Sequence, residues 1–181
     1  MLPLTPVEPF LPNQYRLKLA CAAWERHGYA QLRRAVFCRE QGLFVDDDQD
    51  ELDAVALPII ALTCVLGMPD QVVGGVRIHS PAPDIWHGSR LVVHAEYRQV
   101  SGIGSELIRH AVSIAHARGC QRFLAQVQAR NLPLFRRLHW RSLTELILHG
   151  QPHHLMEADL AHYPPRWQDE YGWVGTLRSA A

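Results

Sequence analysis

The sequence is poor in lysine and has no long apolar run. Lys18 is the only lysine among 181 residues, and 18 basic residues balance 18 acidic ones, so the formal net charge is zero. A nucleic-acid-binding protein usually carries a basic excess or a basic stripe, which this sequence lacks. No stretch reaches the roughly 18 apolar residues that a membrane span needs. We therefore expect neither a nucleic-acid partner nor a membrane partner.

Signals for secretion, disulfides and metals are missing as well. Residues 1–13 contain four prolines but no basic region followed by an apolar stretch, which predicts a cytoplasmic protein. The four cysteines form no C-x-x-C pair, so they are expected to be free, buried thiols. Among eleven histidines, the densest cluster, His149, His153 and His154, lacks the spacing of a metalloprotease helix. The sequence predicts no metal site.

The most acidic segment of the chain runs from position 46 to position 53. Asp46, Asp48 and Asp50 match the first three ligand positions of an EF-hand loop. Glu51 stands where that loop requires glycine, and Leu57 stands where it requires glutamate, so calcium binding is not expected. Two interpretations remain, a solvated acidic loop and an acidic rim that attracts a cationic amine.

Apolar periodicity divides the chain into alternating strands and helices. Expected strands cover 15–19, 57–66, 71–79, 86–94, 123–127, 143–148 and 154–160, and expected helices cover 24–43, 102–118 and 131–138. Turns are expected at 68–70 and 150–152, and Asn131 is the expected N-cap of the third helix. This order predicts an αβ sheet with antiparallel hairpins and two central crossovers. We expect an N-terminal arm over 1–13, one domain over 14–163 and a C-terminal tail over 164–181.

A glycine-bearing loop joins the strand Leu91–Val93 to the longest helix. Glycines allow a ligand to approach the backbone, and the N–H groups at a helix start favour an anion such as a pyrophosphate. A dinucleotide-binding loop would need glycine where Leu107 stands, and no Gly-Lys-Ser/Thr of a Walker A loop occurs in the sequence. The loop therefore predicts a phosphate-bearing ligand of another kind.

The segment Gln99-Val100-Ser101-Gly102-Ile103-Gly104 resembles the Q/R-x-x-G-x-G/A motif of GNAT acetyltransferases. The resemblance spans about residues 15–160 and includes 37–44 and 131–140. The segments 86–91 and 149–160 resemble, more narrowly, bacterial GNAT proteins described as nitrogen-starvation N-acetyltransferases. The resemblance implies an α/β (α+β) fold with a mixed, mainly antiparallel sheet of about six to seven strands flanked by helices.

The same resemblance implies acetyl-CoA as the co-substrate. In it, the strand 91–93 faces the pantetheine arm and the thioester, and the N–H groups of 100–105 hold the pyrophosphate. Asn131 contacts the cofactor from the next crossover. The residues that the resemblance assigns to the cofactor are Leu91, Val92, Val93, Gln99, Val100, Ser101, Gly102, Ile103, Gly104, Ser105 and Asn131.

Two features depart from the family pattern. Many GNAT enzymes carry a tyrosine that protonates the departing thiolate, and Phe135 stands in the matching position. One extra residue lies between Val93 and Gln99. Our candidate for the base that deprotonates the amine is His87, because strand alternation places 87 and 93 on one face and an ordinary imidazole pKa of about 6.5 suits the role. The alternative is a structural or solvent-facing histidine.

Two functional hypotheses follow from the resemblance. The first is an N-acetyltransferase that transfers an acetyl group from acetyl-CoA to an amine of a small molecule. The second is a CoA-binding sensor or partner subunit without turnover, which the missing tyrosine favours slightly. GNAT proteins often form homodimers, but the sequence leaves the oligomeric state and the acceptor open.

Overall fold

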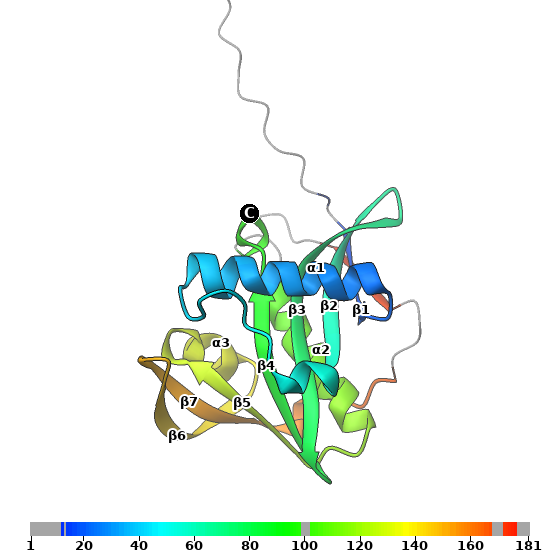
Figure 1. The fold of residues 1–181 in the computed structure, drawn as a ribbon. Helices are drawn as coiled ribbons and strands as arrows, with labels where there is room; N and C mark the ends of the chain where they lie inside the picture. The colour runs from blue at the N-terminus through cyan, green and yellow to red at the C-terminus, as the bar shows by residue number, and fades with distance from the viewer. Residues whose placement is uncertain (1–11, 13, 99–101, 168–171, 177–181) are drawn as a thin grey trace, which may run out of the picture.

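Eight strands form a single sheet in a computed structural model that describes residues 12, 14–98, 102–167 and 172–176. The strands are β1 (Gln14–Leu19), β2 (Leu57–Val65), β3 (Met68–Ala82), β4 (Ile85–Val93), β5 (Arg122–Gln128), β6 (Trp140–Leu148), β7 (Gln151–Ala158) and β8 (Trp173–Thr176). Their order in space is β6-β7-β5-β4-β3-β2-β1-β8 (Figure 1). The strand pairs are antiparallel apart from the parallel pair of β4 and β5. This confirms the predicted mainly antiparallel sheet, with slightly more strands than expected.

Helices cover both faces of this sheet. Helix α1 (Ala23–Arg33) continues as a π-helix (Arg34–Glu40) and packs on one face, while α2 (Ile103–Ala117) and α3 (Leu132–Arg137) lie on the other face (Figure 1). Short 3-10 helices cover Glu51–Ala54, Ala95–Tyr97, Ala129–Asn131 and Leu160–His162. Helix α2 buries its apolar stripe because Ile103, Leu107 and Ile114 recur at helical spacing. No helix in the described part of the chain is both long and apolar enough to cross a bilayer.

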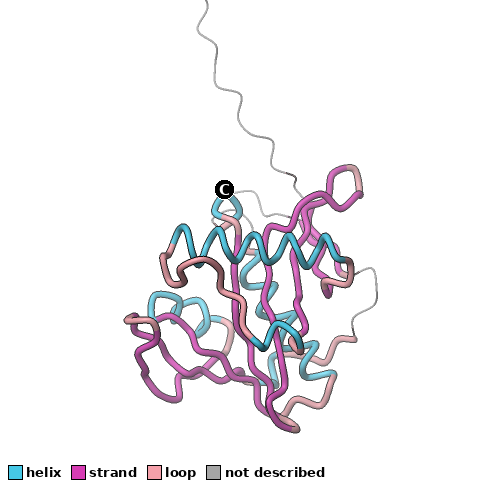
Figure 2. The backbone as a smooth tube through the Cα atoms, in the orientation of Figure 1, coloured by secondary structure: helices cyan, strands magenta, loops and turns pink. Residues whose placement is uncertain are grey.

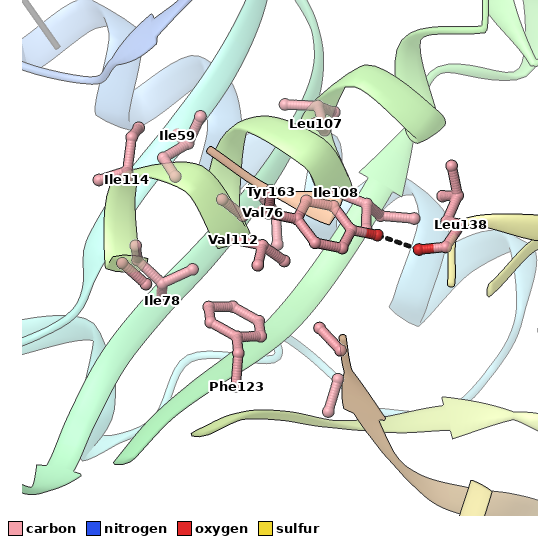
Figure 3. Close-up of a cluster of buried hydrophobic side chains, with 14 of the residues drawn as sticks. Ile59, Val76, Ile78, Leu107, Ile108, Val112, Ile114, Phe123, Leu138 and Tyr163 are labelled. Carbon is pink, nitrogen blue, oxygen red and sulfur yellow. Dashed lines mark hydrogen bonds between the residues drawn. The ribbon is translucent and has the colours of Figure 1, made fainter. Parts of the chain in front are cut away.

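The larger core cluster lies between α2 and the sheet (Figure 3). Ile59, Ile78, Val112 and Phe123 pack there with at most 2% of their surface exposed, and burial of such side chains contributes about 2 kcal/mol each. The Tyr163 hydroxyl lies within this cluster and donates a hydrogen bond to the backbone carbonyl of Leu138. This bond ties the segment after β7 to the end of α3.

Both hairpin turns fall earlier in the chain than predicted. Leu66 and Gly67 have φ of 51° and 80°, and His149 and Gly150 have φ of 49° and 70°. Two successive residues with positive φ match the twist of antiparallel strands, so each turn needs only two residues. Met68–Asp70 and Gln151–Pro152, which we expected in turns, belong to β3 and β7.

The segment after residue 164, expected to be a tail, contributes the edge strand β8. It pairs antiparallel with β1, from Leu17 opposite Trp173 to Gln14 opposite Thr176. Gly172 permits this docking, because its φ is +71° and a Cβ at this position would lie 2.3 Å from the carbonyl oxygen of Leu17. The domain boundary at residue 163 therefore leaves out a strand that joins the sheet.

Candidate active site

The two parallel central strands separate part-way along their length. β4 and β5 pair from Ile85 opposite Arg122 to Gly88 opposite Ala125. Beyond this point β4 continues against β3, and β5 continues against β7. No pairing between β4 and β5 is described past Gly88, and Figure 1 shows β5 slanting away from β4. This separation, which we call the fork, leaves backbone N–H and C=O groups of both strands facing a gap between them.

A β-bulge interrupts β4 beside the fork. Ser89 lies opposite Arg77 and Val92 lies opposite Gly75, so two residues of β4 oppose one residue of β3. Within the bulge Arg90 adopts φ +54°, which is unusual for a residue other than glycine. The Tyr29 hydroxyl of α1 donates a 2.8 Å hydrogen bond to the Arg90 carbonyl oxygen. A buried side chain of α1 therefore stabilises a strained backbone segment of the central strand.

The bulge corrects the geometry that we predicted for His87. Simple alternation placed 87 and 93 on one face, but the extra residue between Ser89 and Val92 reverses the alternation. Val92 packs with the α1 cluster, and Val93 packs with the α2 cluster. His87 is on the same face as Ser89, which lies on the α1 side, so the argument from strand parity is wrong. The catalytic role of His87 stays a prediction.

His87 lies beside a second histidine on the neighbouring strand. It is directly opposite His79 of β3, and the two ring centroids are 5.6 Å apart. Burial lowers the pKa of His87, and burial together with the neighbouring charge of His87 lowers the pKa of His79. Both half-buried imidazoles are therefore neutral at pH 7, which is the form that can accept a proton.

The acidic segment folds against buried arginines. Arg33 of α1 contacts Asp48 at 2.8 Å and Asp53 at 2.5 Å, and Arg77 of β3 contacts Asp50 at 2.5 Å and Asp53 at 2.9 Å. The hydrogen bonds from Arg77 hold the pKa of Asp50 below its usual range. For Asp53, burial alone would raise the pKa, but the bonds from Arg33 and the backbone of Asp50 lower it overall. These carboxylates are therefore ionised at pH 7.

Arg90 of the bulge completes this ion-pair network. Its guanidinium lies 2.7 Å from Asp48 and 3.2 Å from Asp50, and it packs over the Phe44 ring at 4.7 Å. Three arginines and three aspartates thus neutralise one another. Asp48 is only 2% exposed, so the segment is not a fully solvated loop, while Asp46, Asp47 and Glu51 stay exposed and make no ion pair among the described residues.

The loop that follows the π-helix crosses the α1 face of the sheet toward β5. Figure 2 shows this loop leaving the first helix and descending to the 3-10 helix 51–54. Gln41 hydrogen-bonds Gln128 of β5 at 3.3 Å, and the Phe44 ring lies 4.9 Å from His149 in the β6–β7 turn. The loop therefore runs from the end of α1 to the β5 side of the fork and borders the fork on the α1 side.

Helix α2 starts beside the far end of β4. Gly102 has φ +62° and no side chain caps the helix, while a Cβ at Gly104 would meet only Val93 Cγ2, at 3.6 Å. The backbone there is thus open to a ligand, and first-turn N–H groups lack carbonyl partners within the helix. Gln99, Val100 and Ser101, which we assigned to the cofactor, lie outside the described residues.

The other residues that the sequence analysis singled out differ in their burial and in their side-chain contacts. Val92 is buried, and Leu91 and Val93 pack partly against the α2 cluster. Asn131 is the N-cap residue of α3, as predicted, and Pro133 lies in the first turn, but the Asn131 side chain makes no capping bond. Phe135 is 6% exposed and packs edge-on against Trp140 at 5.0 Å, so it belongs to the core.

A sequence profile described as the acetyltransferase (GNAT) family matches residues 24–140, well over half of the chain. The chain belongs to the GNAT family. The fork, the bulge and the uncapped start of α2 all lie within the matched region. The narrower resemblance to nitrogen-starvation N-acetyltransferases stays a prediction.

Solved structures support the same GNAT fold. A candidate N-acetyltransferase from Lactobacillus plantarum superposes with a TM-score of 0.71 at 20% identity, covering 80% of this chain and 97% of that one. An acyl-CoA N-acyltransferase from Pseudomonas aeruginosa gives 0.63 at 21% identity, with 80% and 99% covered. N-acetylglutamate synthase from Neisseria gonorrhoeae, complexed with coenzyme A and N-acetyl-glutamate, gives 0.60 at 19% identity, with 84% and 35% covered. Among curated protein sequences, none matches significantly.

The sequence analysis missed the arginines of the ion-pair network. We noted the scarcity of lysine but did not relate the arginines to the acidic segment. One signal was available, since Arg77 interrupts an otherwise apolar strand and a buried charge needs a partner.

In the described part of the chain, no group of three or more potential metal ligands comes together.

Proposed function

We propose that this GNAT protein transfers an acetyl group from acetyl-CoA to an amine of a small molecule. The observation that carries the proposal is the fork between β4 and β5 beside the N-terminus of α2, whose N-cap residue is Gly102. The fork offers unpaired backbone groups to a pantetheine arm, and the helix start offers N–H groups to a pyrophosphate. Leu91–Val93, Gly102–Ser105 and Asn131 are the described residues that we assign to the cofactor.

The proposed reaction is a direct acyl transfer. The amine nitrogen attacks the thioester carbonyl carbon, a C–N bond forms, the C–S bond breaks, and the thiolate leaves and is protonated by solvent. A backbone N–H at the end of β4 stabilises the oxyanion, and alignment of the two substrates supplies much of the acceleration. His87 takes the proton of the amine, through water because its side chain and that of Val93 face opposite sides of the sheet.

The acceptor approaches from the α1 side, where His79 and His87 are. Because the ion-pair network neutralises Asp48, Asp50 and Asp53, any attraction of this segment for a cationic acceptor comes from the exposed Asp46, Asp47 and Glu51. Acetyl as the acyl group, the small size of the acceptor, a cytoplasmic location and a homodimer are parts of the proposal that rest on the family resemblance.

A second candidate function is CoA binding without turnover, in a sensor or partner subunit. Phe135 favours it, because a buried phenyl ring in the core cannot protonate a thiolate. The N–H groups and the fork serve binding equally well in both functions, so only a measurement of turnover separates them.

Free thiol released from acetyl-CoA, measured with a panel of small amines, tests the proposal. Acetyl transfer predicts thiol release that depends on both the amine and the enzyme, with a stoichiometric acetylated product detected by mass spectrometry. Saturable acetyl-CoA binding without release for any amine supports the second function. Absence of acetyl-CoA binding by calorimetry would refute both.

A further inference from the structure

A cavity of about 330 Å³ lies between α1 and the segment 49–58, over β2 and β3. Its apolar wall includes Ala30, Leu57 and the 70% exposed Val55, and its polar wall includes Arg26, Arg33, Arg77 and Asp53. This volume falls in the range of small-molecule sites, which are mostly apolar with a few polar groups that orient the ligand. None of its lining residues comes from β4, β5 or α2, so it is separate from the proposed cofactor site.

The cavity has one uncompensated positive charge. Arg33 and Arg77 are engaged by Asp48, Asp50 and Asp53 of the ion-pair network. The hydrogen bond described for Arg26 runs from Nε to the Ala20 carbonyl oxygen at 3.1 Å, and no ion pair of Arg26 is described within 14–98 and 102–167. Arg26 is an exposed side chain, and this bond holds its Nε beside the cavity while its terminal N–H groups stay available to solvent or a ligand.

We propose that this cavity binds a small organic monoanion, a carboxylate on a short apolar body, as an effector. The carboxylate pairs with Arg26, and the apolar body packs against Ala30, Val55 and Leu57. The positive charge disfavours an ammonium group, so this cavity is not the site of the acceptor amine. A matching neutral amide lacks the charge-assisted bond and binds more weakly.

The effector role follows from two contacts that lead from the cavity to β4. Tyr29 lines the cavity and donates its hydroxyl to the carbonyl of Arg90 in the bulge. Arg33 also lines the cavity and shares Asp48 with Arg90. A ligand that shifts Tyr29 or Arg33 therefore acts on the bulge. The effect of such a ligand on acetyl transfer rests on the proposed function.

Titration of the ¹⁵N-labelled protein with hexanoate, hexanamide and hexylamine tests the binding. We expect hexanoate to bind with a Kd of about 1 mM, typical of a ligand with so few atoms, and to shift signals of Arg26 and Val55. Hexanamide and hexylamine should bind at least roughly 10-fold more weakly. Equal affinity for the acid and the amide would overturn the proposed recognition of an anion.

Two variants locate the site, and a third is the control. Arg26→Gln removes the free charge, and Ala30→Leu fills the cavity from α1; each should weaken hexanoate binding roughly 10-fold or more. Arg34→Gln removes an exposed charge outside the lining and should leave binding unchanged. Wild-type affinity in both cavity variants would sink the proposal. These titrations contain no CoA, so a failure of the proposed function leaves their result interpretable.

The effector role is tested separately on the complete reaction. Saturating hexanoate should change thiol release from acetyl-CoA at least about twofold in the wild type and leave the Arg26→Gln variant unaffected. Binding at this cavity with unchanged kcat and KM would overturn the effector role while leaving the binding site in place.

Discussion

The two sides of β4 are built from different parts of the molecule. On the fork side, the site consists of backbone: separated strands, a glycine with φ +62° and a helix start without a side-chain cap. On the α1 side, it consists of side chains, with three arginines from α1, β3 and β4 paired to aspartates of one segment. The bulge at Arg90 belongs to both, because Tyr29 and Asp48 hold it from the α1 side while its backbone lies beside the fork.

Under the proposed function, this difference separates the two substrates of one strand. A cofactor common to a whole family can be bound through backbone groups, which tolerate sequence change, whereas an acceptor is distinguished by side chains. We therefore expect changes on the fork side to affect cofactor affinity, and changes on the α1 side to affect turnover or stability with cofactor affinity preserved.

The largest expected effect is on the fork side. Gly104→Val should abolish measurable acetyl-CoA binding in calorimetry, because a branched side chain blocks the ligand's approach to the backbone. The fold should tolerate the change, since a Cβ at 104 meets only Val93 Cγ2, at 3.6 Å. Ala117→Val adds the same branched group at the other end of α2 and should bind normally. Unchanged affinity in Gly104→Val would remove this loop from the cofactor site.

Next in size is the loss of a buried charge on the α1 side. Asp48→Ala leaves Arg33 and Arg90 without a shared partner and should lower the free energy of unfolding by about 3 to 5 kcal/mol. Asp47→Ala removes an exposed neighbour whose described bond is to the Gln49 N–H. It should change the free energy of unfolding by about 0.5 kcal/mol or less. Chemical denaturation measures both, and equal effects would contradict the buried network.

The catalytic hypothesis comes third. His87→Ala should lower kcat by roughly 100-fold at neutral pH with little change in acetyl-CoA affinity. Because burial lowers the pKa of His87, the neutral base persists below pH 6.5, so the wild-type rate should fall only in more acidic solution. His94→Gln is the control and should preserve both the rate and the profile.

Other outcomes of the pH–rate profile have definite meanings. A raised KM with near-normal kcat would make His87 a residue that binds the acceptor. An identical acidic limb and unaltered turnover in the variant would exclude it from the mechanism.

A smaller effect tests whether the α1 side acts on the fork through the bulge. Tyr29→Phe removes the hydroxyl that bonds the Arg90 carbonyl and should lower kcat roughly 10-fold, with acetyl-CoA affinity unchanged. Tyr163→Phe removes an equivalent buried hydroxyl, bonded to the Leu138 carbonyl away from the fork, and should cost stability only. Equal kcat losses in the two variants would mean that Tyr29 has no specific role.

The smallest expected effect is that of calcium, which should leave the melting temperature unchanged. Glu51 and Leu57 replace the glycine and glutamate of a calcium loop, and Asp48 and Asp50 already bind arginines. A calcium-dependent rise that disappears on substitution of Asp46 and Asp48 would contradict this.

The sequence predicted what depends on local patterns. The period of Ile103, Leu107 and Ile114 located α2, and Gly102 located its start, because both signals lie within one segment. The bulge could not be predicted in the same way, because the non-apolar Gly88–Arg90 followed by the apolar Leu91–Val93 does not mark which residue is the extra one.

The ion-pair network and β8 escaped prediction for another reason. Arg33, Arg77 and Arg90 meet the acidic segment only after α1, β3 and β4 have packed together, so no window of sequence contains the pattern. The same holds for β8, whose four residues gain their stability from β1, at the opposite end of the described chain. Long-range pairing overrides weak local preference in both cases.

The pairing of β8 with β1 also bears on how the protein is made. β1 (Gln14–Leu19) leaves the ribosome long before β8 (Trp173–Thr176), yet the two are neighbours in the finished sheet. Contacts between such distant segments close late, after local hairpins and helices have formed. Until translation has passed residue 176, one side of β1 therefore remains an open strand edge, and such an edge is prone to pair with another chain.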